Sequence, residues 1–485
     1  MLTIDCQARH ALHSVEATRR IEAIAQSSLP RHALMQRAGI AVARLGLAIA
    51  PHCRRIWIAC GPGNNGGDGL ETAVHLRRAG KSVFVTWLGR TDTAPPDAAA
   101  SFQHALAAGV SIGDEPPRDC DLCIDAMLGI GSMRDPEGRM ADWIHLMNAS
   151  SGIVLAVDVP TGLHADTGVI SQHYVDADHT LSLLTLKPGL FTGHGRDVAG
   201  KVWLDRLEVS HSMSEDQGVI APLAWLAGAP AVAARAHASH KGSFGDVAVI
   251  GGAPGMTGAA LLAASAALHA GAGRVFVGLL DGGSMTVDVN QPELMVRPIE
   301  TLDFRSLTVV CGCGGGAVIA EPLARILSTA GTLVLDADAI NKIACDSKFQ
   351  SLLIARTGRL AATVLTPHPL EAARLLSCGV DEVQADRLAA AQLLANRFHC
   401  TVVLKGSGTI VAAPGQTPIV NSTGNARLAT AGTGDVLAGM IGAGLAARLP
   451  PFQAASQAVY RHGLHADQWS ADMAPLTAKA LSELG

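Results

Sequence analysis

The chain of 485 residues contains few aromatic and few charged side chains. Aromatic residues make up 4% of the sequence and charged residues 16%, whereas 48% of all residues are hydrophobic. Cores built from such a sequence are aliphatic and rich in Ala, as in parallel sheets covered by helices. The net charge is −5, so the sequence lacks the excess of basic residues expected of a protein whose main partner is nucleic acid or an anionic membrane.

Long apolar runs and targeting signals are also missing. No run free of Gly, Pro and charge reaches the roughly 18 apolar residues needed to cross a bilayer. The N-terminal segment carries Asp5, Arg9 and Glu16 without the apolar core of a signal peptide. Cys60 and Cys311 lie in strand-like stretches and are typical of small buried side chains in a reducing compartment. We therefore expect a cytoplasmic protein.

Cys120 and Cys123 are the one cysteine pair with the spacing of metal ligands. A structural zinc site would need a second pair or nearby His, and the next cysteine in the sequence is Cys311. Residues 121–128 moreover have the pattern of a strand. We therefore do not expect zinc at this pair.

The length of the chain and its periodicity predict two α/β domains. The first half has strand-like segments separated by helical or polar stretches, at 55–60, 82–88, 121–128, 152–159 and 179–186. The pattern dissolves between Val209 and Ala238, as in a linker. Further strands are expected at 246–250, 274–279, 307–311, 332–336, 361–366 and 401–405. We place the boundary near residue 213, which gives domains 1–213 and 214–485, each with a parallel sheet.

A Gly-rich segment follows the first predicted strand. Gly61-Pro62-Gly63-Asn64-Asn65-Gly66-Gly67-Asp68-Gly69 precedes a helix expected over 70–78, so the unit has the order of a Rossmann-like fold. The dinucleotide fingerprint is only loosely met. Two Asn amides and an Asp supply both donors and acceptors, which suits a ribose, a nicotinamide ring or a hard cation.

Polar residues also stand at the ends of later strands. In open α/β sheets, ligands bind beyond the carboxyl ends of the strands. We therefore expect one crevice to collect Asn65, Asp68, Asp125, Asp158 and Thr161. In the second half, strand ends carry Asp336, Asp338, His368 and Lys405.

The segment 425–435 ends in Gly432-Thr433-Gly434-Asp435, directly before an apolar helix. The amides and the dipole at a helix start favour a phosphate. A carboxylate beside a phosphate is repelled unless it transfers a proton or holds a cation, so Asp435 is a candidate general base. The alternative is that Asp435 caps the helix.

Together these motifs resemble one family. Asn64 to Gly69, the strand end at Asp125 and Asp158-Val159-Pro160-Thr161-Gly162 resemble the epimerase domain of NAD(P)H-hydrate repair enzymes. Four further segments resemble the ADP-dependent dehydratase domain of the same enzymes, which has a ribokinase-like fold. They are His240 to Gly245, Thr366-Pro367-His368-Pro369, Lys405-Gly406 and Asn425 to Gly439. The order and spacing of the motifs are similar to those of the bifunctional bacterial form across almost the whole chain.

The resemblance implies repair of hydrated NADH and NADPH, called NADHX and NADPHX. The first domain would interconvert the R and S hydrates with a bound potassium ion. The second would dehydrate the S form with ADP as co-substrate, together with Mg²⁺, giving AMP and phosphate. It also implies a homo-oligomer that acts on small molecules, with neither nucleic acid nor membrane as a partner.

The resemblance also assigns individual residues. The potassium ligands would be Asn65, Asp125 and Thr161. The hydrate would be bound in the first domain by Asn64, Asn65, Gly66, Gly67, Asp68, Gly129, Ile130, Gly131, Ser132, Met133, Arg134, Asp135 and Asp158. In the second domain it would meet Ala259, Gly316, His368 and the catalytic Asp435. The nucleotide would be bound by Lys405, Gly406, Ser407, Gly408, Thr409 and Gly434.

Some roles have two interpretations. Asp158 is a candidate proton shuttle for epimerisation and Lys187 a second one, although a surface lysine is the commoner interpretation of Lys187. A histidine between prolines, such as His368, either orients a loop or contacts the ligand. The chain also departs from the family: Cys311 to Gly316 lacks the usual proline and leucine, and Ile130, Ser132 and Met133 replace a more typical Thr-containing segment.

Two other functions compete with this interpretation. A ribokinase-like small-molecule kinase, for instance one acting on a hydroxyethylthiazole, would explain Gly432 to Asp435 equally well. It would not explain the fused N-terminal motif. The first half could also be a non-catalytic nucleotide-binding or scaffolding module, but the presence of Asp68, Asp125 and Asp158 together argues against lost activity.

Overall fold

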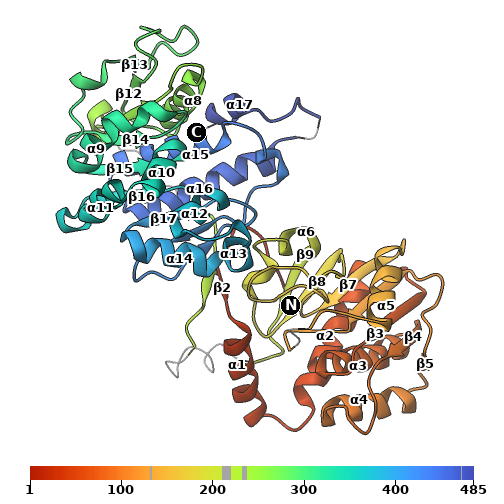
Figure 1. Ribbon diagram of the computed structural model, residues 1–485. Coiled ribbons are helices and arrows are strands. Elements are labelled where there is room, and N and C mark those ends of the chain that lie inside the picture. The colour runs from red at the N-terminus through yellow and green to blue at the C-terminus, as the bar shows by residue number, and fades with distance from the viewer. Residues whose placement is uncertain (132–133, 210–219, 232–236, 471, 485) are drawn as a thin grey trace. The chain divides into compact units, whose positions relative to one another are not determined.

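The computed structural model describes residues 1–131, 134–209, 220–231, 237–470 and 472–484. The chain divides into two compact units, Met1–Leu226 and Ala227–Gly485 (Figure 1). Each unit is built on a mostly parallel sheet with helices, so the predicted α/β class is confirmed. The boundary predicted near residue 213 lies outside the described residues.

The first unit contains an eight-stranded sheet in the order β1-β9-β8-β7-β6-β3-β4-β5. Its strands are β1 (Leu2–Thr3), β3 (Arg55–Cys60), β4 (Ser82–Trp87), β5 (Ser111–Gly113), β6 (Leu122–Ala126), β7 (Ile153–Val157), β8 (His179–Leu183) and β9 (Lys201–Asp205). All neighbours run parallel except β1 and β9. Strands β2 (His10–Leu12) and β10 (Ala224–Leu226) pair antiparallel with each other. The five strands predicted for this half are all present, whereas β1, β2, β5, β9 and β10 were not predicted.

Helices cover both faces of this sheet. They are α1 (Val15–Ser27), α2 (Ala33–Ile49), α3 (Asn64–Arg78), α4 (Pro96–Ala107), α5 (Arg139–Asn148) and α6 (Gly195–Val198). Alternate side chains of β3 enter opposite cores, as the pleat of a strand requires. Ile56 and Ile58 pack with α2 and α3, whereas Trp57 packs with Trp143 of α5.

The structure corrects the start of the helix expected over 70–78. Helix α3 begins at Asn64, so most of the Gly-rich segment forms its first turns. The glycines there allow close packing: a Cβ at Gly66 would lie 2.0 Å from the carbonyl oxygen of Gly61, and one at Gly69 would lie 2.6 Å from Cβ of Ala126. These glycines thus bring the helix start against the strand ends, where the pattern had suggested a loop.

The second unit contains strands in the order β13-β12-β11-β14-β15-β16-β17-β18-β19. They are β11 (Asp246–Gly251), β12 (Arg274–Leu279), β13 (Met295–Val296), β14 (Thr308–Cys311), β15 (Thr332–Leu335), β16 (Ala362–Leu365), β17 (Thr401–Leu404), β18 (Ile410–Ala412) and β19 (Ile419–Val420). The order is parallel from β13 to β17 and antiparallel from β17 to β19. The six predicted strands are confirmed, and β13, β18 and β19 are additional.

The helices of this unit are α8 (Thr257–His269), α9 (Ala320–Thr329), α10 (Ala337–Cys345), α11 (Ser347–Ala355), α12 (Pro369–Leu376), α13 (Val380–Ala385), α14 (Arg387–Phe398), α15 (Thr433–Ala446), α16 (Pro451–Gln468) and α17 (Ala478–Ser482). Helices α8 and α15 approach closely, because a Cβ at Gly439 would lie 2.0 Å from the carbonyl oxygen of Ala263. Their Ala residues share one core with the central strands. No helix in the described ranges is long and apolar enough to span a bilayer.

Candidate active sites of the two units

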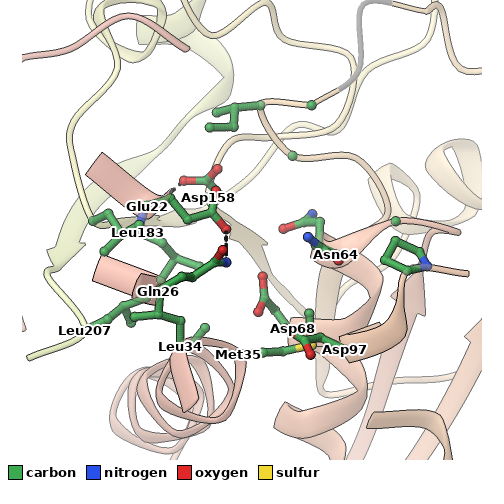
Figure 2. A pocket seen from close by; sticks show the side chains of 18 of the residues that line it. Glu22, Gln26, Leu34, Met35, Asn64, Asp68, Asp97, Asp158, Leu183 and Leu207 are labelled. Atoms are coloured by element: carbon green, nitrogen blue, oxygen red, sulfur yellow. Dashed lines mark hydrogen bonds between the residues drawn. The ribbon is translucent and has the colours of Figure 1, made fainter. Parts of the chain in front are cut away.

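The first unit holds a cavity of about 650 Å³ beside the carboxyl ends of its strands. It is lined from α1, α2, the start of α3 and the segments after β6 and β7. Four carboxylic acids surround it: Glu22, Asp68, Asp97 and Asp158 (Figure 2). Of the five residues expected in one crevice, Asn65, Asp68 and Asp158 line this cavity, whereas Asp125 and Thr161 are buried and are not among its lining residues.

Asp125 and Thr161 form a buried pair next to this cavity. Both residues are fully buried. The Asp125 carboxylate accepts hydrogen bonds from the Thr161 hydroxyl (2.7 Å), the Thr161 amide (2.7 Å) and the Met127 amide (3.1 Å). Burial raises the pKa of Asp125 to about 6, against the effect of these hydrogen bonds. A buried carboxylate of this kind favours a nearby positive charge.

Asn65 lies close to the same strand ends. A Cβ at Gly129 would lie 3.2 Å from Cγ of Asn65, and the neighbouring Leu128 amide donates to the Thr161 hydroxyl at 2.9 Å. The Asn65 side-chain amide nitrogen is buried and has no hydrogen-bond partner within the described part of the chain. Because the two ends of an Asn amide are interchangeable by a flip, this position suits an oxygen ligand for a cation.

Asp158 lines the cavity and is held by a buried lysine. Lys187 is 0% exposed, and its ammonium group donates to Asp158, to the Leu183 carbonyl oxygen (2.8 Å) and to the Ser182 hydroxyl (3.3 Å). The interpretation of Lys187 as a surface lysine is therefore wrong. Asp158 also has a φ of 69°, an unfavourable conformation for a residue other than Gly that is often found at functional sites.

Neighbouring carboxylic acids perturb one another around the cavity. Burial and the charge of Asp158 raise the pKa of Glu22, and burial together with Asp158 and Glu22 raises the pKa of Asp68 well above its usual value. Carboxylic acids whose pKa is raised by burial and by one another are candidates for proton transfer at a functional site. Glu22 and Gln26, whose side-chain amide donates to Glu22 at 3.2 Å, come from α1 and carried no signal in the sequence.

Some of the residues assigned to binding of the hydrate line the cavity, and others do not. Asn64, Asn65, Asp68, Gly129, Ile130, Gly131, Arg134 and Asp158 line it. Gly66 and Gly67 are instead buried in the packing of α3, and Asp135 is not among the lining residues. Ser132 and Met133 lie outside the described residues.

In the second unit, Asp435 lies in the first turn of α15. The residue that caps this helix is Gly432, with a φ of 92°, so Asp435 is not the cap. Ligand atoms of Asp435, Asp336 and Cys313 lie within 4.8 Å of one another. Burial and the negative charge of Asp336 raise the pKa of Asp435 to about 6, which is near the operating range of a general base.

A lysine completes this arrangement. The Lys405 ammonium group lies 2.7 Å from the Asp336 carboxylate, which also accepts a hydrogen bond from the Thr366 hydroxyl at 2.6 Å. A Cβ at Gly434 would lie 3.3 Å from Nζ of Lys405, so the turn before Asp435 approaches this cation. The sequence places Asp336 at a strand end without indicating its role, and in the structure Asp336 holds Lys405 beside Asp435.

The rest of the predicted nucleotide segment is a turn after β17. Gly406 and Gly408 have φ values of 128° and 60°, which favour glycine. The Thr409 hydroxyl donates to the Gly406 carbonyl oxygen at 3.0 Å, and Ser407 is exposed. The turn thus leaves polar groups accessible beside Lys405.

Ala259 and Gly316 lie at a glycine loop near this site. Ala259 of α8 faces the loop, since a Cβ added at Gly314 would lie 2.8 Å from the Cβ of Ala259. The Gly316 amide donates to the Asp338 carboxylate at 2.8 Å. Cys313 links the same loop to Asp435. The structure therefore brings Ala259, Gly316 and Asp435 to one region.

His368 has a structural role in the start of α12. Its Nδ1 accepts from the amides of Leu370 (3.2 Å) and Glu371 (3.4 Å), while the Glu371 carboxylate accepts from the His368 amide (2.8 Å). This reciprocal capping orients the loop. Contact of the half-exposed ring with a ligand stays a prediction.

Family models match both parts of the chain. Residues 31–189 match the model described as YjeF-related protein N-terminus, and residues 247–484 match the model of NAD(P)H-hydrate dehydratase. The chain is 35% identical over 449 residues to the bifunctional NAD(P)H-hydrate repair enzyme of Escherichia coli, covering 90% of this chain and 85% of that protein. The corresponding enzyme of Leishmania braziliensis is 36% identical over 492 residues, 93% and 87% of the two chains.

The chain belongs to the family of bifunctional NAD(P)H-hydrate repair enzymes. The resemblance drawn from the motifs is thereby confirmed, and the alternative of a kinase fused to a non-catalytic module is not favoured. Among solved structures, an ADP/ATP-dependent NAD(P)H-hydrate dehydratase from Bacillus subtilis is 30% identical with a TM-score of 0.44, covering 52% of this chain and 91% of that chain.

Proposed function

We propose that this chain carries both repair activities of its family, with a separate site for each. The first unit would interconvert the R and S hydrates of NADH and NADPH. The second would convert the S hydrate and ADP into NAD(P)H, AMP and phosphate. The observation that carries the proposal is Asp435, whose carboxyl group has a raised pKa and lies at a helix start beside Lys405.

The dehydration begins with the problem that hydroxide is a poor leaving group. Asp435 accepts the proton of the hydrate hydroxyl, and the oxygen attacks the terminal phosphorus of ADP as the bond to AMP breaks. Lys405 and the amides of the first turn of α15 stabilise the negative charge on the transferring group. The ring nitrogen then expels phosphate, and loss of a proton from the adjacent carbon restores the double bond.

The nucleotide would be positioned by Lys405 to Thr409 and Gly434. Mg²⁺ is proposed together with ADP, because this ion is bound mainly by phosphates and water, so no protein ligand is assigned to it. Ala259, Gly316 and His368 are proposed to contact the hydrate. Holding both reactants in line removes much of the entropic barrier to the transfer.

The epimerisation occurs at a carbon bonded to the ring nitrogen, so it passes through an iminium or a ring-opened species. Both routes need a proton to be moved, and the iminium route also loses the hydroxyl group as water and places a positive charge on the ring nitrogen. Asp158 is proposed to move the proton, and Lys187 to hold its carboxylate in place. The acidic wall of the cavity, with Glu22 and Asp68, would stabilise a cationic intermediate.

Asn65, Asp125 and Thr161 fit a potassium ion. All three can present oxygen atoms to the ion. Within the described ranges, the buried Asp125 carboxylate accepts hydrogen bonds from a hydroxyl and two amides but from no cationic side chain. The Asn65 side-chain amide nitrogen has no hydrogen-bond partner within the same ranges. The ion would supply positive charge that keeps Asp125 ionised and orders the adjoining strand ends. We also propose a cytoplasmic homo-oligomer, on the composition and family resemblance alone.

The proposal is tested by incubating the chain with R,S-NADHX and ADP. Absorbance of regenerated NADH measures the reaction, and chromatography measures AMP and phosphate. We expect one AMP and one phosphate for each NADH. A mixture without ADP is the control for spontaneous loss of water. Absence of ADP-dependent NADH formation would contradict the proposal.

A further inference from the structure

Two histidines converge on one buried carboxylate in the first unit. His32 precedes α2, Glu71 lies in α3 and His104 lies in the last turn of α4. Nε2 of His32 and Nδ1 of His104 lie 2.7 Å and 2.8 Å from the same oxygen of Glu71. The three ligand atoms are all within 4.8 Å of one another. We call these residues the His32 cluster.

The His32 cluster already contains an anionic ligand. The side chain of Glu71 is only 4% exposed, and that of His32 only 10%. Burial alone would raise the pKa of Glu71, but hydrogen bonds from His32 and His104 outweigh burial and hold this pKa below its usual value. Two imidazoles are therefore directed at one oxygen of a buried carboxylate.

We propose that the His32 cluster binds one zinc-like transition-metal ion, a site that goes beyond the proposed repair function. Two imidazole nitrogens and one carboxylate oxygen are a common ligand set for zinc with a fourth position left for water. Tetrahedral ligands at about 2.0–2.2 Å from zinc lie about 3.3 Å apart. The two contacts to Glu71 must therefore open by about half an ångström, which the half-exposed His104 allows.

A second carboxylate supports this assignment. Metal-bound histidines commonly donate their other ring N–H to a carboxylate, which fixes the tautomer and the ring orientation. Nδ1 of His32 is buried and has no hydrogen-bond partner among the described residues, and a carboxylate oxygen of Asp97 is 3.7 Å away. Metal binding at Nε2 would leave Nδ1–H to donate to Asp97. The site therefore has the outer partner that a ligating His32 needs.

The position of His32 is also strained. Its φ of 68° is unfavourable for a residue with a side chain, and the ring makes no capping hydrogen bond to α2. His32 and Asp97 both line the cavity of the first unit. A bound ion would join α2, α3 and α4 and thereby fix this part of the cavity wall.

The test uses the full-length protein after removal of metal with a chelator. Calorimetry with Zn²⁺ should show one saturable site per chain, and Co²⁺ should give the visible spectrum of a tetrahedral site without a thiolate charge-transfer band. His104→Ala should abolish this binding. Asp97→Ala should weaken it about 10- to 100-fold, as for other outer partners of metal ligands. His145→Ala, at an exposed histidine of α5, is the matched control and should bind normally.

Three results would overturn the proposal. The first is the absence of saturable Zn²⁺ binding by the wild-type chain, which would leave a hydrogen-bonded cluster only. The second is undiminished binding by His104→Ala. The third is a thiolate band with Co²⁺, which would place the ion at a cysteine such as Cys313. If circular dichroism shows that His104→Ala is unfolded, the Zn²⁺ affinity of Asp97→Ala tests the proposal instead. An affinity of Asp97→Ala equal to that of the wild-type chain would then reject the site.

Discussion

Replacing Asp435 with Asn removes the proposed general base while keeping the size and shape of the side chain. The amide retains the size of the carboxyl group at the start of α15 but cannot accept the hydroxyl proton of the hydrate. Loss of a general base typically costs about 100- to 10,000-fold in rate. This corresponds to about 3 to 5 kcal/mol in the activation free energy. ADP binding should change little, because Lys405 and the helix amides remain.

The raised pKa of Asp435 adds a pH dependence to this prediction. With a pKa of about 6, the base is ionised above pH 6, and kcat/KM for dehydration by the wild-type chain should fall as pH drops through that value. The rise from 3.8 to about 6 corresponds to an upper bound of about 3 kcal/mol lost from folding stability at neutral pH. Asp435→Asn should therefore unfold at higher temperature at pH 8, and this difference should vanish at pH values below 3.8, where the carboxyl group is protonated in both states.

The assay follows NADH regeneration from (S)-NADHX at several pH values, with ADP binding measured by calorimetry. Asp381→Asn, in the first turn of the exposed start of α13, is the matched control and should behave as wild type. Turnover by Asp435→Asn within a few fold of wild type would refute the assignment. An equal loss of ADP affinity and rate would instead show that Asp435 binds the nucleotide.

The other predictions concern both sites. Asp125→Ala should slow epimerisation and remove its dependence on potassium without changing dehydration of (S)-NADHX; unchanged R-to-S conversion at every potassium concentration would reject Asp125 as a ligand. Lys187→Met leaves the carboxylate of Asp158 buried without its cation, so the first unit should lose about 3 to 5 kcal/mol of stability in thermal unfolding, and unchanged stability would contradict the role of Lys187 as the partner of Asp158. Burial raises the pKa of Asp435 and the Cys313 hydrogen bond opposes that rise, so Cys313→Ala should move the acid limb of the dehydration profile to higher pH, whereas Cys311→Ala should not.

Strand positions and strand-end chemistry could be predicted because they are local properties of the sequence. Apolar runs bounded by polar residues located the central strands of both units, and the rule for ligands in open sheets placed Asp125 and Asp158 at one crevice. Short edge strands such as β1 and β5 have too few residues to form a pattern. The helical start of α3 was missed because its glycines serve packing against β3 and β6, which only the folded unit defines.

Long-range partners account for what the sequence did not show. Lys187 precedes Pro188 and Gly189, a pattern typical of an exposed turn, and its burial depends on the carboxylate of Asp158 from another strand end. Glu22 reaches the cavity from α1, far from the Gly-rich motif in sequence. The His32 cluster likewise joins three helices whose pairing no local pattern indicates.

The central claim is that one chain both epimerises and dehydrates the hydrate, and the progress curve on R,S-NADHX tests it most directly. With excess ADP, the wild-type chain should convert both epimers in a single rapid phase, seen as regenerated NADH. Asp158→Asn should convert the S epimer at the normal rate and the R epimer only as fast as spontaneous epimerisation allows. Rapid consumption of both epimers by that variant, or none by the wild-type chain, would contradict the account.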